Sequence, residues 1–196
     1  PNGLRGVGGD LSVERLLEAY RRGIFPWFSA GQPILWWSPD PRTVLYPGEL
    51  KVSRSLAKTL RNRGFRTTVD QAFEQVMERC ADPTLRPEGT WISPQMRDAY
   101  RRLHDLDYAH SFETWEGDQL VGGLYGVTLG RVFFGESMFH RKTNASKMAM
   151  AHLVERLKAG GFVLLDTQFV TDHLASLGGV EIPREHYEER LAEALH

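Results

Sequence analysis

The spacing of hydrophobic and polar residues changes along the chain between a helical period and strict alternation, which predicts a mixed α+β protein. Apolar positions four residues apart predict a helix over Val13–Arg22, which Ser12 caps and Gly23 ends. Residues Ala109–Trp115 alternate instead, and a turn leads into a returning strand over Leu120–Leu129. The other expected elements are strands at Thr43–Tyr46, Phe65–Val69, Val132–Met138 and Phe162–Leu165, and helices at Ser53–Arg63, Asp70–Cys80, Ser93–His104, Asn144–Ala159, His173–Leu177 and Arg184–Leu195, with Asp70 and Ser93 as N-caps.

The second half of the chain orders these elements as three strands, a long helix and one buried strand. This βββαβ order is typical of an acyltransferase sheet, in which the helix crosses to a parallel strand, although other α+β domains share it. The first forty residues form a distinct unit, because the proline-containing segment Ser38–Arg42 marks a junction. We therefore predict a small N-terminal α/β domain at 1–41 and a larger α+β domain at 42–196.

Composition and charge exclude several classes of protein. No apolar run is long enough to span a membrane and no signal peptide opens the chain. The single cysteine, Cys80, excludes an internal disulfide, so we expect a cytoplasmic protein. The seven histidines lack ligand spacing, so we expect no metal. A net charge of -1 is low for a protein that wraps nucleic acid, so any RNA contact must come from a local patch.

The segment Lys51–Arg66 is such a patch, because it carries basic residues and no acid. Arg54, Lys58 and Arg61 share one face of the predicted helix. A face of one charge sign suits phosphates, whereas a solvated face usually mixes signs; both alternatives stay open. The aromatic residues between Phe25 and Trp37 are either the core of the N-terminal domain or a platform on which bases stack.

Two strand segments carry acids that point to chemistry. Glu136 lies among aromatic residues and a methionine, where a carboxylate is costly unless paired and is a suitable anchor for an ammonium group. Asp166 directly follows an apolar strand and shares a face with Gln168. The alternatives are an ordinary strand-edge residue at Glu136 and a loop-capping residue at Asp166.

Segments spread over nearly the whole chain resemble, in their order, those of the leucyl/phenylalanyl-tRNA–protein transferases. They are GGDLS at Gly8–Ser12, AYRRGIFPWFS at Ala19–Ser29, ILWWSPDPR at Ile34–Arg42, GTWI at Gly89–Ile92, AYRRLH at Ala99–His104, LVGGLYGV at Leu120–Val127, FFGESMF at Phe133–Phe139, NASK at Asn144–Lys147 and HLASLGG at His173–Gly179. The resemblance implies a GNAT-like fold for the second domain. Because no glycine-rich pyrophosphate loop opens the helix at Asn144, we expect no acetyl-CoA or other cofactor.

The resemblance implies transfer of leucine or phenylalanine, and less well methionine, from Leu-tRNA, Phe-tRNA or Met-tRNA. The implied acceptors are proteins that begin with arginine or lysine, and the product is a degradation signal, an N-degron. Neither DNA nor a membrane is expected as a partner.

The resemblance also carries over site residues. Glu136, Asp166 and Gln168 match the family's polar catalytic residues, and Arg54, Lys58 and Arg61 match tRNA contacts, the last two in charge only. The aromatic residues expected around the 3′ end of the donor are Tyr20, Trp27, Trp91 and Tyr100. The expected side-chain pocket consists of Leu124, Phe133, Met138, Met150, Leu153, Leu157 and Leu165. Leu153 and Leu157 stand where bulkier aromatic residues are typical, which predicts a roomier pocket.

The chemistry of the donor predicts the mechanism. Its ester is already activated, so we expect the acceptor amine to attack directly, without an acyl-enzyme. A neutral amide does not titrate in this range, so Gln168 is expected to orient the amine with help from Asp166. We expect Asp166→Ala to lose rate far more than donor binding. Two other functions stay open, a CoA-dependent N-acetyltransferase and a non-enzymatic RNA-binding module.

Overall fold

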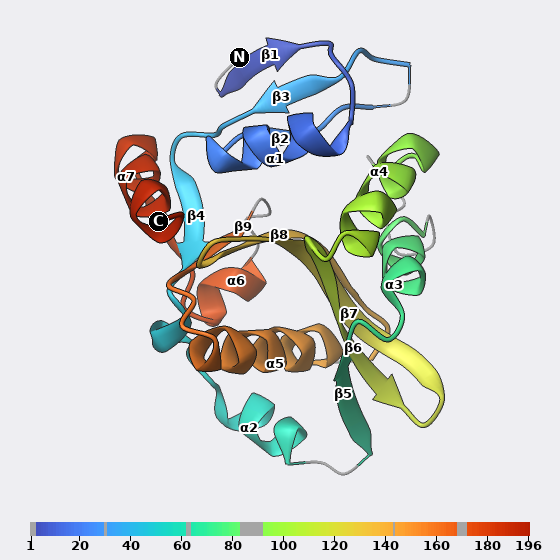
Figure 1. The fold of residues 1–196 in the computed structure, drawn as a ribbon. Helices are drawn as coiled ribbons and strands as arrows, with labels where there is room; N and C mark the ends of the chain where they lie inside the picture. The colour runs from blue at the N-terminus through green and yellow to red at the C-terminus, as the bar shows by residue number, and fades with distance from the viewer. Residues whose placement is uncertain (1–2, 30, 62–63, 83–91, 143, 168–171) are drawn as a thin grey trace.

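Two β-sheets organise the chain in the computed structural model, which describes residues 3–29, 31–61, 64–82, 92–142, 144–167 and 172–196 (Figure 1). The smaller sheet has the strand order β1-β3-β2 and comes from the N-terminal segment. Its strands are β1 (Leu4–Val7), β2 (Phe25–Pro26) and β3 (Leu35–Trp37), and helix α1 (Val13–Arg21) lies beside them.

The predicted first helix is confirmed, together with its cap. The hydroxyl oxygen of Ser12 accepts a hydrogen bond from the backbone N–H of Arg15 at 3.3 Å. Leu16, Leu17 and Tyr20 form its buried face. Gly23 follows the helix with φ of 75°, a conformation that favours glycine.

The larger sheet has seven strands in the order β10-β4-β9-β8-β7-β6-β5. The strands β6, β7 and β8 form an antiparallel meander, and α5 (Ala145–Ala159) crosses to β9, which runs parallel to β8. The predicted βββαβ order is therefore confirmed. The strands are β4 (Arg42–Leu45), β5 (Phe65–Val69), β6 (Ala109–Glu116), β7 (Gln119–Leu129), β8 (Val132–His140), β9 (Leu164–Thr167) and β10 (Val180–Ile182).

Each face of the large sheet carries its own apolar core. On one face, α5 packs with Leu124, Phe133 and Leu165. The opposite face packs against α1 and the other helices above the sheet in Figure 1.

The remaining helical elements are η1 (Pro47–Glu49), α2 (Arg54–Leu60), α3 (Phe73–Cys80), α4 (Pro94–Asp105), α6 (Asp172–Ser176) and α7 (Arg184–Ala194).

Of the two predicted caps after residue 60, one is confirmed and one is wrong. Ser93 accepts from the backbone N–H of Met96 at 3.2 Å, with proline at the first helical position. Asp70 does not cap α3, because Ala72 occupies the cap position. Its carboxylate instead accepts from the backbone N–H of Ser111 at 2.8 Å and contacts His110 Nδ1 at 2.7 Å, which ties the β5–α3 connection to β6.

The division at residue 41 stays a prediction. The segment after β3 does lead from the small sheet into β4. However, Tyr20 and Trp36 from the N-terminal part share an apolar core with Tyr100 and Phe134 from the large sheet and its helices. No helix in the described ranges combines the length and apolar character that crossing a membrane requires.

Candidate active site

A bulge in β8 determines where the predicted site residues point. Gly126 of β7 pairs with Gly135 while Tyr125 pairs with Ser137, so Glu136 is an extra residue on β8. A Cβ atom on Gly126 would collide with the carbonyl oxygen of Phe134, so only glycine fits beside the bulge. The bulge places Phe133 and Met138 on the same side of the sheet, in the core of α5.

Glu136 faces the opposite side, where two tyrosines surround it. Its carboxylate is buried and accepts a hydrogen bond from the Tyr20 hydroxyl at 2.5 Å. The Tyr20 hydroxyl lies 2.5 Å from that of Tyr100, so α1 and α4 meet at this carboxylate. Burial raises the pKa of Glu136 to about 7, against the hydrogen bonds from Tyr100 and Tyr20, which lower it. Burial also raises the pKa of both tyrosines, so they remain hydrogen-bond donors at neutral pH.

Asp166 lies in a second buried polar cluster that the sequence did not predict. Arg42 donates from Nε to Oδ1 at 3.0 Å and from Nη2 to Oδ2 at 2.8 Å. The hydroxyl of Tyr187 donates to Oδ2 at 2.6 Å, and its ring lies 4.3 Å from the guanidinium carbon. Burial alone would lower the pKa of Arg42, but Asp166 and Tyr187 raise it overall, so the arginine stays charged.

The two carboxylates lie on neighbouring strands, near the point where the parallel pairing of β8 and β9 ends. The parallel pairing of β8 and β9 ends with Gly135 opposite Thr167. Glu136 follows that last pair, and Asp166 precedes it, opposite Phe134. Gln168 directly follows Thr167 in the chain, but it lies outside the described residues, as does Trp91.

The structure brings the predicted pocket residues together. Leu124, Phe133, Met150, Leu153, Leu157 and Leu165 are buried in the α5 core, and Met138 packs against it half-buried. Phe112 joins them, with its ring centre 6.0 Å from that of Phe133 in an edge-to-face contact. The alternation of β6 could have indicated Phe112 as an inward-facing residue.

The N-terminal aromatic residues differ in their exposure to solvent. Phe25, Phe28 and Trp36 are buried core residues, whereas Trp27 is 51% exposed. The ring centres of Trp27 and Trp37 lie 6.1 Å apart in an edge-to-face arrangement. Within the described residues, the exposed ring of Trp27 is therefore the part of this tract that is open to a stacking partner.

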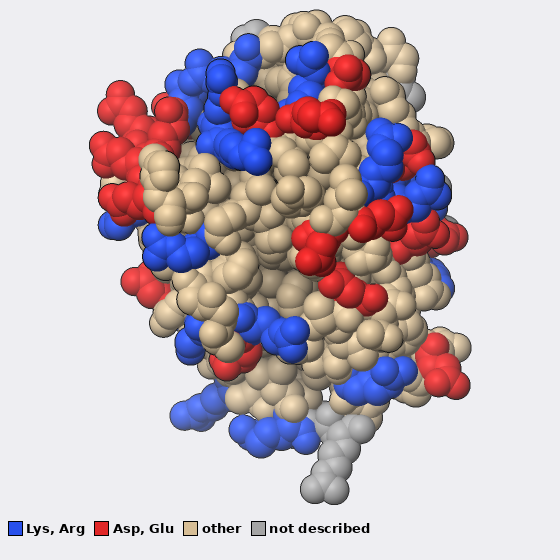
Figure 2. Space-filling view, in the orientation of Figure 1, with Lys and Arg blue, Asp and Glu red and all other residues tan. Residues whose placement is uncertain are grey.

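The predicted basic face lies on α2, away from the buried acids. Arg54, Lys58 and Arg61 are exposed there, while Leu56 is buried. None of the three forms an ion pair with another described residue. Figure 2 shows basic side chains at the end of the molecule where Figure 1 places α2.

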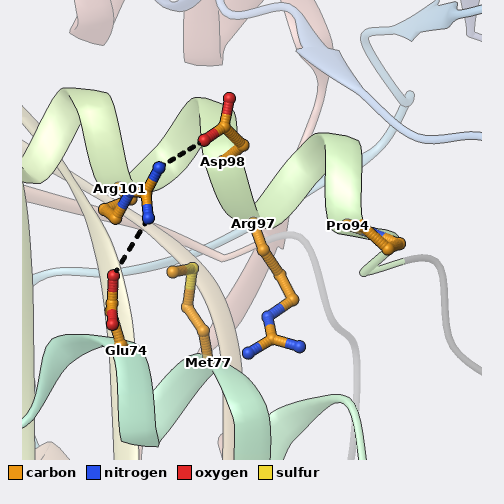
Figure 3. Close-up of a pocket in the computed structure, with 6 residues that line it drawn as sticks. All are labelled: Glu74, Met77, Pro94, Arg97, Asp98 and Arg101. Atoms are coloured by element: carbon orange, nitrogen blue, oxygen red, sulfur yellow. Dashed lines mark hydrogen bonds and ion pairs between the residues drawn. The ribbon is translucent and has the colours of Figure 1, made fainter.

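A groove between α3 and α4 lies apart from these residues (Figure 3). Its volume is about 250 Å³, and Arg101 spans it with ion pairs to Glu74 at 3.6 Å and to Asp98 at 2.5 Å. The acids at this groove form surface ion pairs with Arg101, and they are not placed beside a base that could take part in catalysis. The groove is therefore not assigned to the reaction. In the described ranges, no three His, Cys, Asp or Glu side chains are grouped as metal ligands.

Known proteins resemble the chain both in sequence and in fold. The family model for leucyl/phenylalanyl-tRNA protein transferase matches residues 44–192, and the model for that family's N-terminal domain matches residues 9–40. The leucyl/phenylalanyl-tRNA–protein transferase of Nitrosospira multiformis is 59% identical over 100% of this chain and 84% of its own length. That of Azotobacter vinelandii is 57% identical over 100% of this chain and 86% of its own length.

One solved structure resembles the chain in fold, and at its low sequence identity this likeness bears on the fold and not on the function. The GCN5-related glucosamine N-acetyltransferase region of a fungal multi-domain beta-N-acetylglucosaminidase superposes with a TM-score of 0.51 at 12% identity. The match covers 91% of this chain and 23% of that chain, and it confirms the expected GNAT-like fold. The sequence matches over both parts of the chain show that the chain belongs to the leucyl/phenylalanyl-tRNA protein transferase family.

Proposed function

We propose that the protein moves leucine or phenylalanine, and less readily methionine, from aminoacyl-tRNA to the N-terminal arginine or lysine of acceptor proteins. Membership of the family supports the coarser part, a transferase with an aminoacyl-tRNA donor and a protein acceptor. The observation that carries the finer part is the bulge in β8, which turns Phe133 and Met138 towards an apolar core and Glu136 towards a polar one. The product would be a degradation signal, formed in the cytoplasm where charged tRNA is used.

The α5 core suits the side chain of the donor amino acid. The residues that form it are mainly apolar, so it favours Leu, Phe and Met over polar residues. Three methionines in it, Met138, Met148 and Met150, have flexible side chains that can rearrange around ligands of different shape. An apolar pocket separates ligands by only about 1–3 kcal/mol per methylene, which agrees with several accepted donors.

Glu136 lies on the face of β8 opposite this core, and there it would hold a substrate ammonium group. A carboxylate that is buried and hydrogen-bonded by Tyr20 has a fixed position, so it orients the bound group without further ordering. The acceptor's amino group, in its neutral form, then attacks the ester carbonyl directly. A C–N bond forms, the ester C–O bond to the ribose breaks, and the proton lost by the amine ends on the ribose oxygen.

The α2 face would hold the tRNA. Its three exposed cations lie on one side of a short helix, and phosphate contacts position a nucleic acid without reading its bases. Exposed Trp27 is the described aromatic residue best suited to stack on the donor's terminal base.

A transfer assay tests this function. The protein is mixed with radiolabelled Leu-tRNA and a peptide that starts with Arg, and separately with the same peptide starting with Ala. We expect label only in the Arg peptide. Saturable use of acetyl-CoA in place of Leu-tRNA would instead identify an N-acetyltransferase, and tRNA binding without transfer would identify an RNA-binding module.

A further inference from the structure

We infer that Arg42 and Tyr187 are positioning residues for the transfer reaction, which fix Asp166 on one side and the end of helix α1 on the other. The inference rests on the proposed function of the carboxylate site. Neither residue was among the predicted site residues, because each acquires its role through contacts that only the fold creates.

The first contact is the one to Asp166. Arg42 and Tyr187 together donate three hydrogen bonds to the two carboxylate oxygens, at 3.0, 2.8 and 2.6 Å. Two parallel bonds from a planar guanidinium fix the plane of the carboxylate, which a lysine ammonium does not do. Arg42 is 2% exposed and Asp166 1%, so water does not compete for these bonds. The direction of the Asp166 side chain is therefore set by Arg42 and Tyr187.

The second contact is the one to α1. Nη1 of Arg42 donates to the carbonyl oxygen of Gly23 at 2.8 Å and to the hydroxyl of Ser38 at 3.3 Å. The Tyr187 ring also lies against Gly23, where an added Cβ would be 2.6 Å from Cε2 of that ring. Gly23 is three residues beyond Tyr20, whose hydroxyl bonds to Glu136. The guanidinium of Arg42 thus connects Asp166 to the end of α1, the helix that carries Tyr20, and Tyr20 is the hydrogen-bond partner of Glu136.

The charges of this cluster reach Glu136. The groups that shift its pKa include Tyr20 on α1, Tyr100 on α4, Asp166 on β9 and Arg42 on β4. Beyond burial and the tyrosine hydrogen bonds, Asp166 raises the pKa of Glu136 and Arg42 lowers it. Removing the two partners should therefore move the titration of Glu136 in opposite directions, which a general loss of folding would not produce.

The test compares Arg42→Lys, Arg42→Gln, Tyr187→Phe and Asp166→Asn in the full chain, with Leu-tRNA and an Arg-initiated peptide. Misplaced reacting groups cost about 100-fold in rate, so we expect kcat of the Arg42 variants to fall by that order with little change in KM for Leu-tRNA. Tyr187→Phe removes one of three bonds to Asp166, so we expect a loss of up to about tenfold. The matched control is Arg184→Lys, because Arg184 donates to the backbone of Ser38 at 2.9 Å without touching Asp166.

Two further measurements separate positioning from folding. If Arg42 acts through Asp166, the double variant Arg42→Lys/Asp166→Asn is no slower than Asp166→Asn alone. The acidic limb of the pH–rate profile should shift to higher pH in Arg42→Gln and to lower pH in Asp166→Asn. Tyr187→Phe keeps the buried ring, so it carries the test if the Arg42 variants fail to fold.

The outcomes distinguish this inference from the proposed function. Failure of the unmodified protein to transfer leucine would overturn the proposed function and, with it, the reaction for which these residues are positioned. Transfer by the unmodified protein, with folded Tyr187→Phe and Arg42 variants that keep its kcat and pH profile, would overturn the positioning role alone. The positioning role would also be overturned if the double variant Arg42→Lys/Asp166→Asn lost the full rate factors of both single variants.

Discussion

The hydroxyl of Tyr20 on α1 donates a hydrogen bond to Oε1 of Glu136 on β8, with 2.5 Å between the two oxygens. The bond joins residues 116 positions apart and links the N-terminal part of the chain to the centre of the large sheet. It lies in a buried environment in which Glu136 has a pKa of about 7. The charge of this carboxylate therefore changes within the range of pH in which enzymes are usually assayed, and this has measurable consequences.

The first prediction concerns activity and pH. If ionised Glu136 holds a substrate ammonium group, kcat/KM for leucine transfer should rise with pH through about 7 as the carboxyl ionises. In Glu136→Gln the acidic limb near that pH should disappear and the rate should be low throughout. The measurement is a pH–rate profile of both proteins. A limb that persists unchanged in Glu136→Gln would assign the titration to another group.

The second prediction concerns stability and pH. The pKa of Glu136 is higher in the folded chain than its ordinary value of 4.5, so the folded state binds more protons between those two values. The free energy of unfolding should therefore fall as pH rises through this window, by roughly 3 kcal/mol for this group at most. Urea unfolding at pH 5 and pH 8 measures it, with Glu136→Gln as the reference. Stability that rises with pH relative to this variant would contradict the prediction.

Much of the fold follows from local sequence patterns, because the relevant interactions lie close together in the chain. Ser12 and Ser93 cap their helices from three residues away, and a short turn pairs β6 with the returning strand β7. The prediction for Asp70 was wrong because a carboxylate serves equally well as a helix cap or as a tie to a distant strand. The actual partners of Asp70, His110 and Ser111, are about forty residues away.

The candidate site was only partly predictable, because its residues meet partners that are distant in the chain. The acids stood out because carboxylates are unusual among aromatic and aliphatic residues. Their partners did not, since Arg42 lies 124 positions from Asp166 and Tyr100 lies far from Tyr20 in the chain. The bulge at Glu136 depends on a glycine in the neighbouring strand, so the sequence alone does not show that Phe133 and Met138 lie on the same face.

A third prediction concerns the choice of donor. Leu153 is fully buried in the α5 core, so Leu153→Phe would reduce the space left for a donor side chain. We expect the ratio of Phe to Leu transferred from an equal mixture of the two charged tRNAs to fall by about tenfold or more. Overpacking also costs roughly 1–3 kcal/mol, so the variant must be shown to be folded.

Leu103→Phe is the control for this experiment. Leu103 is equally buried but lies on α4, on the other face of the sheet. It should lose comparable stability without changing the ratio of Phe to Leu. An unchanged ratio in a folded Leu153→Phe variant would show that the α5 core does not receive the donor.

A fourth prediction concerns tRNA binding. The triple variant Arg54→Gln/Lys58→Gln/Arg61→Gln removes three exposed cations from α2, and we expect weaker binding of tRNA. The slope of the logarithm of the binding constant against that of salt concentration should fall by about three, one for each phosphate that the variant no longer neutralises.

The matched control removes the same charge elsewhere. Arg101, Arg102 and Arg190 form surface ion pairs with Asp98 and Glu193, so their triple replacement by glutamine changes the net charge equally. Equal weakening of tRNA binding by both triple variants would mean that total charge, rather than the α2 face, governs the interaction.

The most direct test of the proposed function is to follow the acceptor itself. Three peptides that differ only in their first residue, Arg, Lys or Ala, are incubated with the protein and Leu-tRNA, and the products are sequenced by mass spectrometry. We predict one leucine added to the amino terminus of the Arg and Lys peptides and none to the Ala peptide, with the addition much reduced in Glu136→Gln. Unmodified Arg and Lys peptides in the presence of folded protein and intact Leu-tRNA would contradict it.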